Sequence, residues 1–208
     1  MRLIHLPLAV LLVFLLTSFS DPKDKLVITS TAFQNNDRIP IKYTCMGSDF
    51  SPPIAISNVP GNTKSFVIIV YDPDGIKIAP ASASNASHTK PAKHTGKKRP
   101  AKESASILKC NPADNCFINW IIWNIDADNV QIPENFKNDN EGFNSTNEVG
   151  YHGICPSSGT HTYHFVVYAL DTKLNISKKS TKAQIEKVML GHILATGELV
   201  GIFNKNYK

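Results

Sequence analysis

Two runs of β-branched and aromatic residues constrain the fold of this chain more than any other feature. Residues 65–71 (SFVIIVY) and 119–125 (NWIIWNI) are almost continuously apolar, as is typical of strands buried on both faces of a sheet. Turn residues separate them from three further apolar segments, at 26–28, 54–56 and 163–170. The sequence therefore predicts a mainly β domain with the two long runs as central strands of its core sheet.

One segment near the C-terminal end has helical periodicity instead. Within residues 181–194, candidates for a buried face recur every three or four residues, at Ile185, Val188, Met189, His192 and Ile193. Ser180 can cap this helix, and Gly197 follows its end. We therefore expect one late helix beside the sheet.

Residues 79–106 differ in kind from the rest of the chain. The 208-residue chain is 42% hydrophobic and 19% charged, but this segment contains no Ile, Val or Leu. It holds six Lys and Arg residues against Glu103 alone, which equals the formal excess of +5 for the whole chain. Because such a segment cannot bury enough apolar surface to order itself, we expect a disordered basic insertion within a single domain. No aromatic residues separate its cations, so specific nucleic-acid binding is not expected.

The first twenty residues have the pattern of a secretory signal peptide. Arg2 precedes the apolar run 6–16, and small residues stand at Ser18 and Ser20, the −3 and −1 positions of a cleavage site before Asp21. An apolar run of this length spans only about 16 Å, roughly half of a bilayer core. We therefore expect a signal peptide over 1–20, export to the periplasm or the medium, and one domain over 21–208 with no transmembrane segment.

Four cysteines in an exported chain predict two disulfides. Cys110 and Cys116 enclose a short, turn-rich loop that can bring their Cα atoms within bridging distance. Cys45 and Cys155 are then left to pair with each other. The alternative is a zinc site formed by His88, His94, Cys110 and Cys116. Its ligand spacings are wider than those usual in zinc fingers, so neither a metal nor another cofactor is expected.

Polar residues cluster where three predicted strands begin or end. Two carboxylates follow the first long run around a proline turn, an amide opens the second run, and an imidazole and a phenol lie where a Gly/Pro/Ser loop enters the last strand. Each group alone also fits ordinary turn chemistry. Together they predict that three strand ends meet at one pocket. The candidate ligand-binding residues are Asp72, Asp74, Asn119, His161 and Tyr163.

Five groups of residues follow one another in an order that identifies a family. They are an opening at 39–53, a first signature at 61–74, a central strand at 120–125, a second signature at 153–163, and a closing helix and strand at 191–201. In this order they resemble the phosphatidylethanolamine-binding proteins, specifically their bacterial Raf-kinase-inhibitor-like branch. The resemblance implies a large antiparallel β-sheet packed on a smaller sheet, a late C-terminal helix and a small anion pocket at one end.

For function, the resemblance implies a non-enzymatic protein that binds a phosphate-like or carboxylate anion, or a phospholipid headgroup. Relatives act on kinases or proteases, which implies a protein partner here too. The signatures carry over Asp72 and Asp74 from the first motif, and His161 and Tyr163 from the second.

Three positions depart from the family pattern. Asn119 stands where a His is usual, Thr162 where an Arg is usual, and Gly75 where Ala-Pro is usual. The first two departures each remove a cation from the expected pocket. Anion binding would then depend on protonated His161, on Tyr163 and on backbone N–H groups.

A hydrolase is the alternative function that the sequence leaves open. Ser157 or Ser158 could act as nucleophile with His161 as base and Asp72 behind it. The loop is not a nucleophile elbow, however, and serines in such loops more often serve turn chemistry. The ligand, the protein partner and the oligomeric state stay open. So does glycosylation, for which the chain has sequons at Asn85, Asn144 and Asn175.

Limited trypsin digestion tests the interpretation of residues 79–106. We expect the first cuts between Lys90 and Lys102, because the segment lacks apolar anchors while its flanks have them. Mass spectrometry of early time points locates the cuts. Earlier cleavage elsewhere, or loss of the fold when the segment is shortened, would contradict this interpretation.

Overall fold

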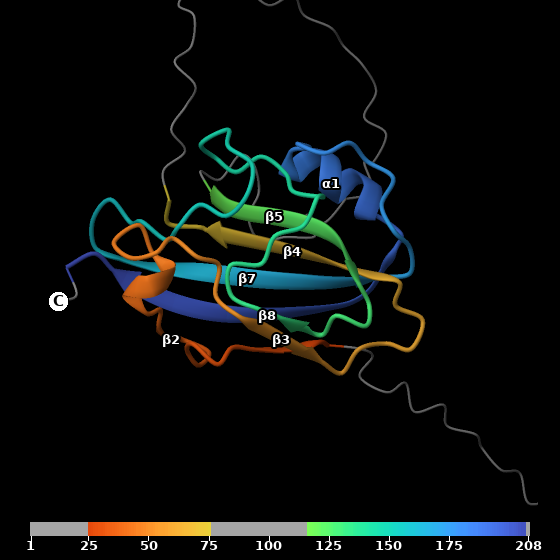
Figure 1. Cartoon of the computed structure of the whole chain (residues 1–208), viewed down its shortest axis with the longest axis horizontal. Coiled ribbons are helices and arrows are strands. Elements are labelled where there is room, and N and C mark those ends of the chain that lie inside the picture. The colour runs from red at the N-terminus through yellow and green to blue at the C-terminus, as the bar shows by residue number, and fades with distance from the viewer. Residues whose placement is uncertain (1–24, 76–115, 207–208) are drawn as a thin grey trace, which may run out of the picture.

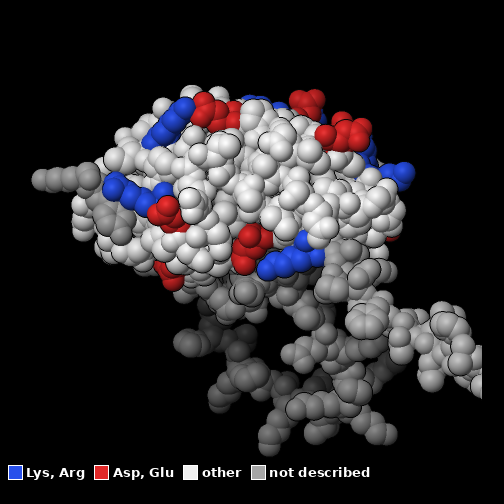
Figure 2. Space-filling model, turned by 90° about the horizontal axis from the view of Figure 1, so that it is seen from below, with Lys and Arg blue, Asp and Glu red and all other residues white. Residues whose placement is uncertain are grey.

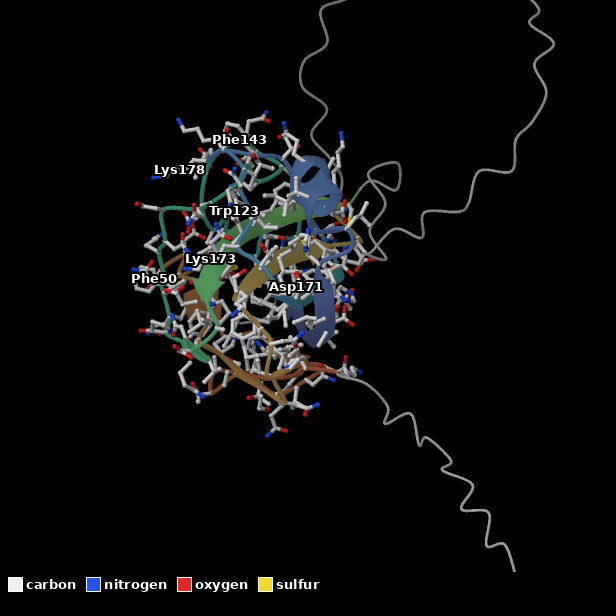
Figure 3. The ribbon with its side chains drawn as sticks, turned by 90° about the vertical axis from the view of Figure 1, so that its right-hand side faces the viewer. Phe50, Trp123, Phe143, Asp171, Lys173 and Lys178 are labelled. Atoms are coloured by element: carbon white, nitrogen blue, oxygen red, sulfur yellow. A yellow bond between two sulfur atoms is a disulfide. The ribbon has the colours of Figure 1, made fainter. Side chains whose placement is uncertain are left out.

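The computed structural model describes residues 25–75 and 116–206, which form two stacked sheets and one helix (Figures 1 and 3). The large sheet has the order β2 (Asp37–Arg38), β8 (Ile193–Asn204), β7 (Thr160–Leu170), β4 (Ser65–Asp72) and β5 (Phe117–Asp126). The small sheet has the order β1 (Val27–Thr29), β3 (Ile54–Ser57) and β6 (Gln131–Ile132). Every strand pair is antiparallel except β2–β8. A short 3-10 helix, Ile41–Tyr43, and α1 (Lys182–Met189) complete the described elements. The expected architecture, a mainly β fold with a late helix, is confirmed.

Strand β4 separates two apolar layers. Its residues are all buried, and neighbouring side chains point to opposite faces of the sheet. Phe66, Ile68 and Val70 pack against the small sheet, while Val67 and Ile69 belong to the layer beneath α1. Burial of each such side chain contributes about 1.5–3 kcal/mol. This two-sided burial explains why the sequence of β4 is continuously apolar instead of alternating.

Strand β5 is an edge strand, which corrects the expectation that it is central. The chain that follows β6 runs along its outer edge and takes up its free backbone groups. The N–H of Trp123 donates to the carbonyl of Asn140 at 3.0 Å. The N–H of Gly142 donates to the carbonyl of Ile121 at 3.0 Å. Because both faces are buried and the edge is covered, β5 has the sequence of a central strand.

The helix begins at Lys182, one residue later than expected. Thr181, not Ser180, precedes the first helical residue, and the N–H of Thr181 donates to Oε1 of Gln184 at 2.8 Å. The hydroxyl of Ser180 donates instead to the carbonyl of Ser177 at 2.7 Å. This local hydrogen bond explains why Ser180 does not cap α1.

The helix also ends at Met189, not at Leu194 as expected. Gly191 adopts a φ of +86°, the left-handed conformation that often ends helices. From Ile193 onward the chain pairs with β7 along its whole length. The apolar residue at 193 therefore belongs to β8, and Gly197 lies inside that strand.

One of the two expected disulfides is confirmed. Cys45 and Cys155 are joined with their Cα atoms 5.5 Å apart, linking two loops that are 110 residues apart in sequence. Cys110 lies outside the described residues, so its bond to Cys116 stays a prediction. The signal peptide at 1–20 and the basic segment at 79–106 also lie outside them. None of the described helices has both the length and the apolar character that a membrane span needs.

Charged side chains are sparse on the small-sheet side of the molecule. Figure 2 shows that most of those visible there lie beside a partner of opposite sign. Elsewhere among the described residues, Lys42 and Glu134 form an ion pair with Nζ and Oε2 2.7 Å apart. The visible part of this face therefore carries no basic patch.

Gly197, in β8, should tolerate no larger side chain, because it packs closely against the chain at β1. An added Cβ would lie 2.5 Å from the carbonyl oxygen of Leu26 and 2.7 Å from Cγ1 of Ile28, so β1 would have to move. We expect Gly197→Ala to lower the free energy of unfolding by about 1–3 kcal/mol, as overpacking does. Gly61→Ala is the control, because a Cβ there meets nothing within 4 Å. Urea unfolding measures both, and equal effects would contradict the close contact.

Candidate functional site

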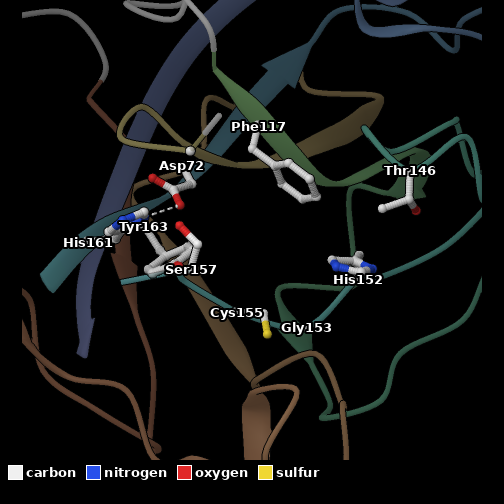
Figure 4. Close-up of a pocket in the computed structure, with 10 residues that line it drawn as sticks. Asp72, Phe117, Thr146, His152, Gly153, Cys155, Ser157, His161 and Tyr163 are labelled. Carbon is white, nitrogen blue, oxygen red and sulfur yellow. Dashed lines mark hydrogen bonds and ion pairs between the residues drawn. The ribbon is translucent and has the colours of Figure 1, made fainter. Parts of the chain in front are cut away.

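A cavity of about 350 Å³ lies at one end of the large sheet (Figure 4). Strand β4 is antiparallel to β5 and β7, so its C-terminal end lies beside the first residue of β5 and the N-terminal part of β7. Asp72 thus pairs with Phe117 in the ladder and lies close to the start of β7. The cavity is lined by Asp72, Gly75, Phe117, Thr146, His152, Gly153, Cys155, Ser157, His161 and Tyr163.

A buried ion pair forms one wall of the cavity. Nδ1 of His161 lies 2.7 Å from Oδ2 of Asp72, and their side chains are 13% and 5% exposed. Burial raises the pKa of Asp72, while the hydrogen bond and charge of His161 oppose this rise. Oδ1 of Asp72 accepts the N–H of Asp74 at 2.8 Å. Since both carboxylate oxygens are engaged, Asp72 orients the imidazole, and Nε2 of His161 is the ring nitrogen that remains for a ligand.

The carboxylate of Asp74 does not line the cavity. Its Oδ2 accepts both the N–H and the hydroxyl of Thr162, each at 3.1 Å. Thr162 stands where the family that the sequence resembles usually has an Arg. Here its two hydrogen bonds to Asp74 join β7 to the turn after β4. Asp74 therefore fixes the rim of the site.

Tyr163 contributes a buried hydroxyl to the same wall. Burial first, and then the nearby carboxylate of Asp72, raise its pKa well above the ordinary value. The group therefore stays protonated at neutral pH and can donate a hydrogen bond. It makes no well-formed hydrogen bond of its own within the described part of the chain. Its ring stacks on His161 with centroids 6.4 Å apart.

Asn119 lies behind the cavity, not in its lining. The side chain is buried, and Nδ2 donates to the carbonyl of His152 at 3.1 Å. The backbone N–H of His152 donates in turn to the carbonyl of Asn119 at 2.8 Å. The sequence did not single out His152, which stands just before the Gly/Pro/Ser loop. Its only local signal is its place directly before Gly153.

Ser157 lines the cavity close to the Asp72–His161 pair, whereas Ser158 does not line it. Across the described residues, no hydrogen bond joins the hydroxyl of Ser157 to His161. The imidazole uses Nδ1 for Asp72, and this orientation is the one that a catalytic triad would share. The structure thus shows an oriented imidazole without an attached nucleophile.

The charge of the cavity depends on its imidazoles. The described lining residues include two histidines and one carboxylate, with neither Lys nor Arg among them. In their protonated form the two imidazoles would add positive charge to the wall, which would then suit an anion.

Comparison with known proteins agrees with this fold. The model of the phosphatidylethanolamine-binding protein family matches residues 29–90 and 106–204. The unmatched residues 91–105 lie within the basic segment 79–106. A UPF0098 protein of Pyrococcus horikoshii is 34% identical over an alignment that covers 98% of this chain and 89% of the relative. A UPF0098 protein of Chlamydia trachomatis is also 34% identical, over 86% and 99%.

Two solved structures have the same fold. A homologue of phosphatidylethanolamine-binding proteins from Chlamydia trachomatis superposes with a TM-score of 0.69 at 32% identity, covering 88% of this chain and 99% of its own. YbcL of E. coli, described as a member of the mammalian family, superposes with a TM-score of 0.64 at 22% identity, covering 86% and 98%. The second likeness is one of fold alone.

The Asp72–His161 pair predicts how the Asp72 carboxyl titrates. Its pKa should lie above the ordinary value of 3.8, because burial outweighs the imidazole. Between pH 3.8 and the pKa of Asp72 in the folded protein, the folded state binds more protons than the unfolded state. The free energy of unfolding therefore falls as the pH rises through this range. Replacing His161 by Ala should raise the pKa of Asp72 further. NMR titration of the carboxyl carbon measures this, with His192→Ala as control. A midpoint that stays or falls in His161→Ala would refute the pairing.

Proposed function

Because this chain belongs to the phosphatidylethanolamine-binding protein family, we propose that it is an exported, non-enzymatic protein whose cavity binds a small phosphate-like anion. The anion is either free phosphate or the phosphate of a phospholipid headgroup. The observation that carries the proposal is the buried pair of Asp72 and His161 at the cavity wall. It holds an imidazole in a fixed orientation while its own carboxylate is turned to protein donors.

Neutral donors support the same function. The protonated hydroxyl of Tyr163 and the hydroxyls of Thr146 and Ser157 line the cavity, and each can donate a hydrogen bond to an anion. Phe117 adds an apolar wall, which suits the carbon chain next to a phosphate ester. The combination favours an oxyanion attached to a small organic group over a bare metal ion.

Export rests on the N-terminal pattern and on the disulfide. Residues 1–20 read as a signal peptide, and Cys45–Cys155 is the kind of bond that persists in oxidising compartments. A protein in the periplasm or outside the cell can meet phospholipid headgroups or free phosphate. We include modulation of a partner protein in this proposal, because the family resemblance implies it.

Removing the oriented imidazole should weaken anion binding and reduce its response to pH. Sulfate is the probe, since its charge does not change between pH 5 and 8. We expect wild type to bind sulfate more tightly at pH 5 than at pH 8, because protonated imidazoles attract an anion. His161→Ala should weaken binding and reduce this dependence, while His192→Ala, in which the lost imidazole is paired with Asp171 outside the cavity, should match wild type. Chemical shifts of backbone amides measure both.

Two further readouts separate the alternatives. Inorganic phosphate and vesicles with phosphatidylethanolamine distinguish a free anion from a lipid headgroup as ligand. A fluorophosphonate reagent tests the hydrolase, because covalent capture at Ser157 would require an activated serine. Sulfate shifts that ignore His161→Ala, or that cluster away from Asp72 and Tyr163, would refute the anion pocket.

A further inference from the structure

His152 differs from the other histidines that the structure describes. Three of the four described histidines place Nδ1 against a carboxylate, at 2.7, 2.6 and 2.8 Å respectively: His161 with Asp72, His164 with Glu198, and His192 with Asp171. Among the described residues, none hydrogen-bonds to the ring of His152. Its ring contact is with Phe117, at 5.4 Å between centroids. Within residues 25–75 and 116–206, both ring nitrogens of His152 therefore lack a hydrogen-bond partner and can serve a ligand.

The backbone of His152 is nevertheless held firmly. Asn119, which is 1% exposed, donates to its carbonyl and accepts from its N–H. Three residues later, Cys155 is tied to Cys45. Side chains that are fixed before binding lose less conformational entropy when the ligand arrives. The surroundings of His152 thus resemble those of a binding residue more than those of a solvated loop residue.

His152 also stands opposite the ion pair. Figure 4 shows His161, Asp72 and Tyr163 on one side of the cavity and His152 on the other. An anion between them would meet imidazole N–H donors from two directions. The carboxylates near this space are turned away, because Asp72 is engaged by His161 and by a backbone N–H, and Asp74 by Thr162.

We infer that His152 is a second anion-binding residue of this cavity, and that with His161 it grips a tetrahedral phosphate group from opposite sides. This inference rests on the proposed function. Imidazole N–H donors that face each other match a tetrahedral group whose oxygens point in several directions. A carboxylate presents both oxygens on one side, so it can use only one imidazole well. The pair therefore favours phosphate esters over carboxylates.

The test is a titration of ring-labelled protein with inorganic phosphate at pH 6.0. In wild type, the ring signals of both His152 and His161 should shift together. His152→Ala should weaken phosphate binding about tenfold or more, as expected for loss of a hydrogen bond to a charged group. Acetate binding should change much less. His192→Ala should leave phosphate binding unchanged, and His152→Gln, which keeps one donor, covers the case in which the alanine variant does not fold.

Asn119→Ala tests how His152 is positioned. It should weaken phosphate binding in wild type but add little once His152 is already Ala, because its effect passes through that imidazole. Additive losses would overturn this link.

Two outcomes separate the inference from the proposed function. If wild type binds phosphate while His152→Ala and His152→Gln bind it equally well and the His152 ring does not shift, the inference fails and the proposed function stands. If wild type binds neither phosphate nor sulfate, both fail.

Discussion

The pairing of β4 with a neighbour on each side is the constraint on which the rest of the structure depends. All of its residues are buried, and it forms antiparallel ladders with β5 and β7. Its alternating side chains contribute to both apolar layers. Because the strand ends at Asp72, the same ladders that bury its apolar residues place one carboxylate between the first residue of β5 and the N-terminal part of β7. Core and cavity therefore share one element.

Burying the carboxylate of Asp72 costs free energy, and a neighbour in the cavity wall offsets part of this cost. Burial disfavours the charge of Asp72, and the imidazole of His161 restores part of the loss. Removing one member of a buried pair commonly costs roughly 3–5 kcal/mol, because the other charge is left uncompensated. Replacing His161 is thus expected to change both anion binding and the free energy of unfolding. A loss of anion binding in its variants is informative only at temperatures where the variant is folded.

Sequence patterns predicted the features that depend on neighbouring residues, namely strands and the polar residues at their ends. Apolar runs located β4, β5 and β7 but not β8, whose first residues were assigned to the helix, and strand ends located Asp72, His161 and Tyr163. The edge position of β5 was missed, because it depends on the distant segment that covers that edge. Asn119 was expected to face the ligand, yet its amide is used by the backbone of a loop 33 residues away. His152 was missed for the same reason, since only the folded chain brings this loop residue to the cavity.

Asn119 and His152 are physically connected. An amide at 119 can turn its N–H group to the carbonyl of residue 152 while remaining uncharged and fully buried. An imidazole there would bring a titratable ring to the same buried place, and burial disfavours its charged form. At position 152 the residue is partly exposed, and no carboxylate of the described residues pairs with its ring. The second imidazole that lines the cavity therefore belongs to a loop anchored by that amide and not to β5.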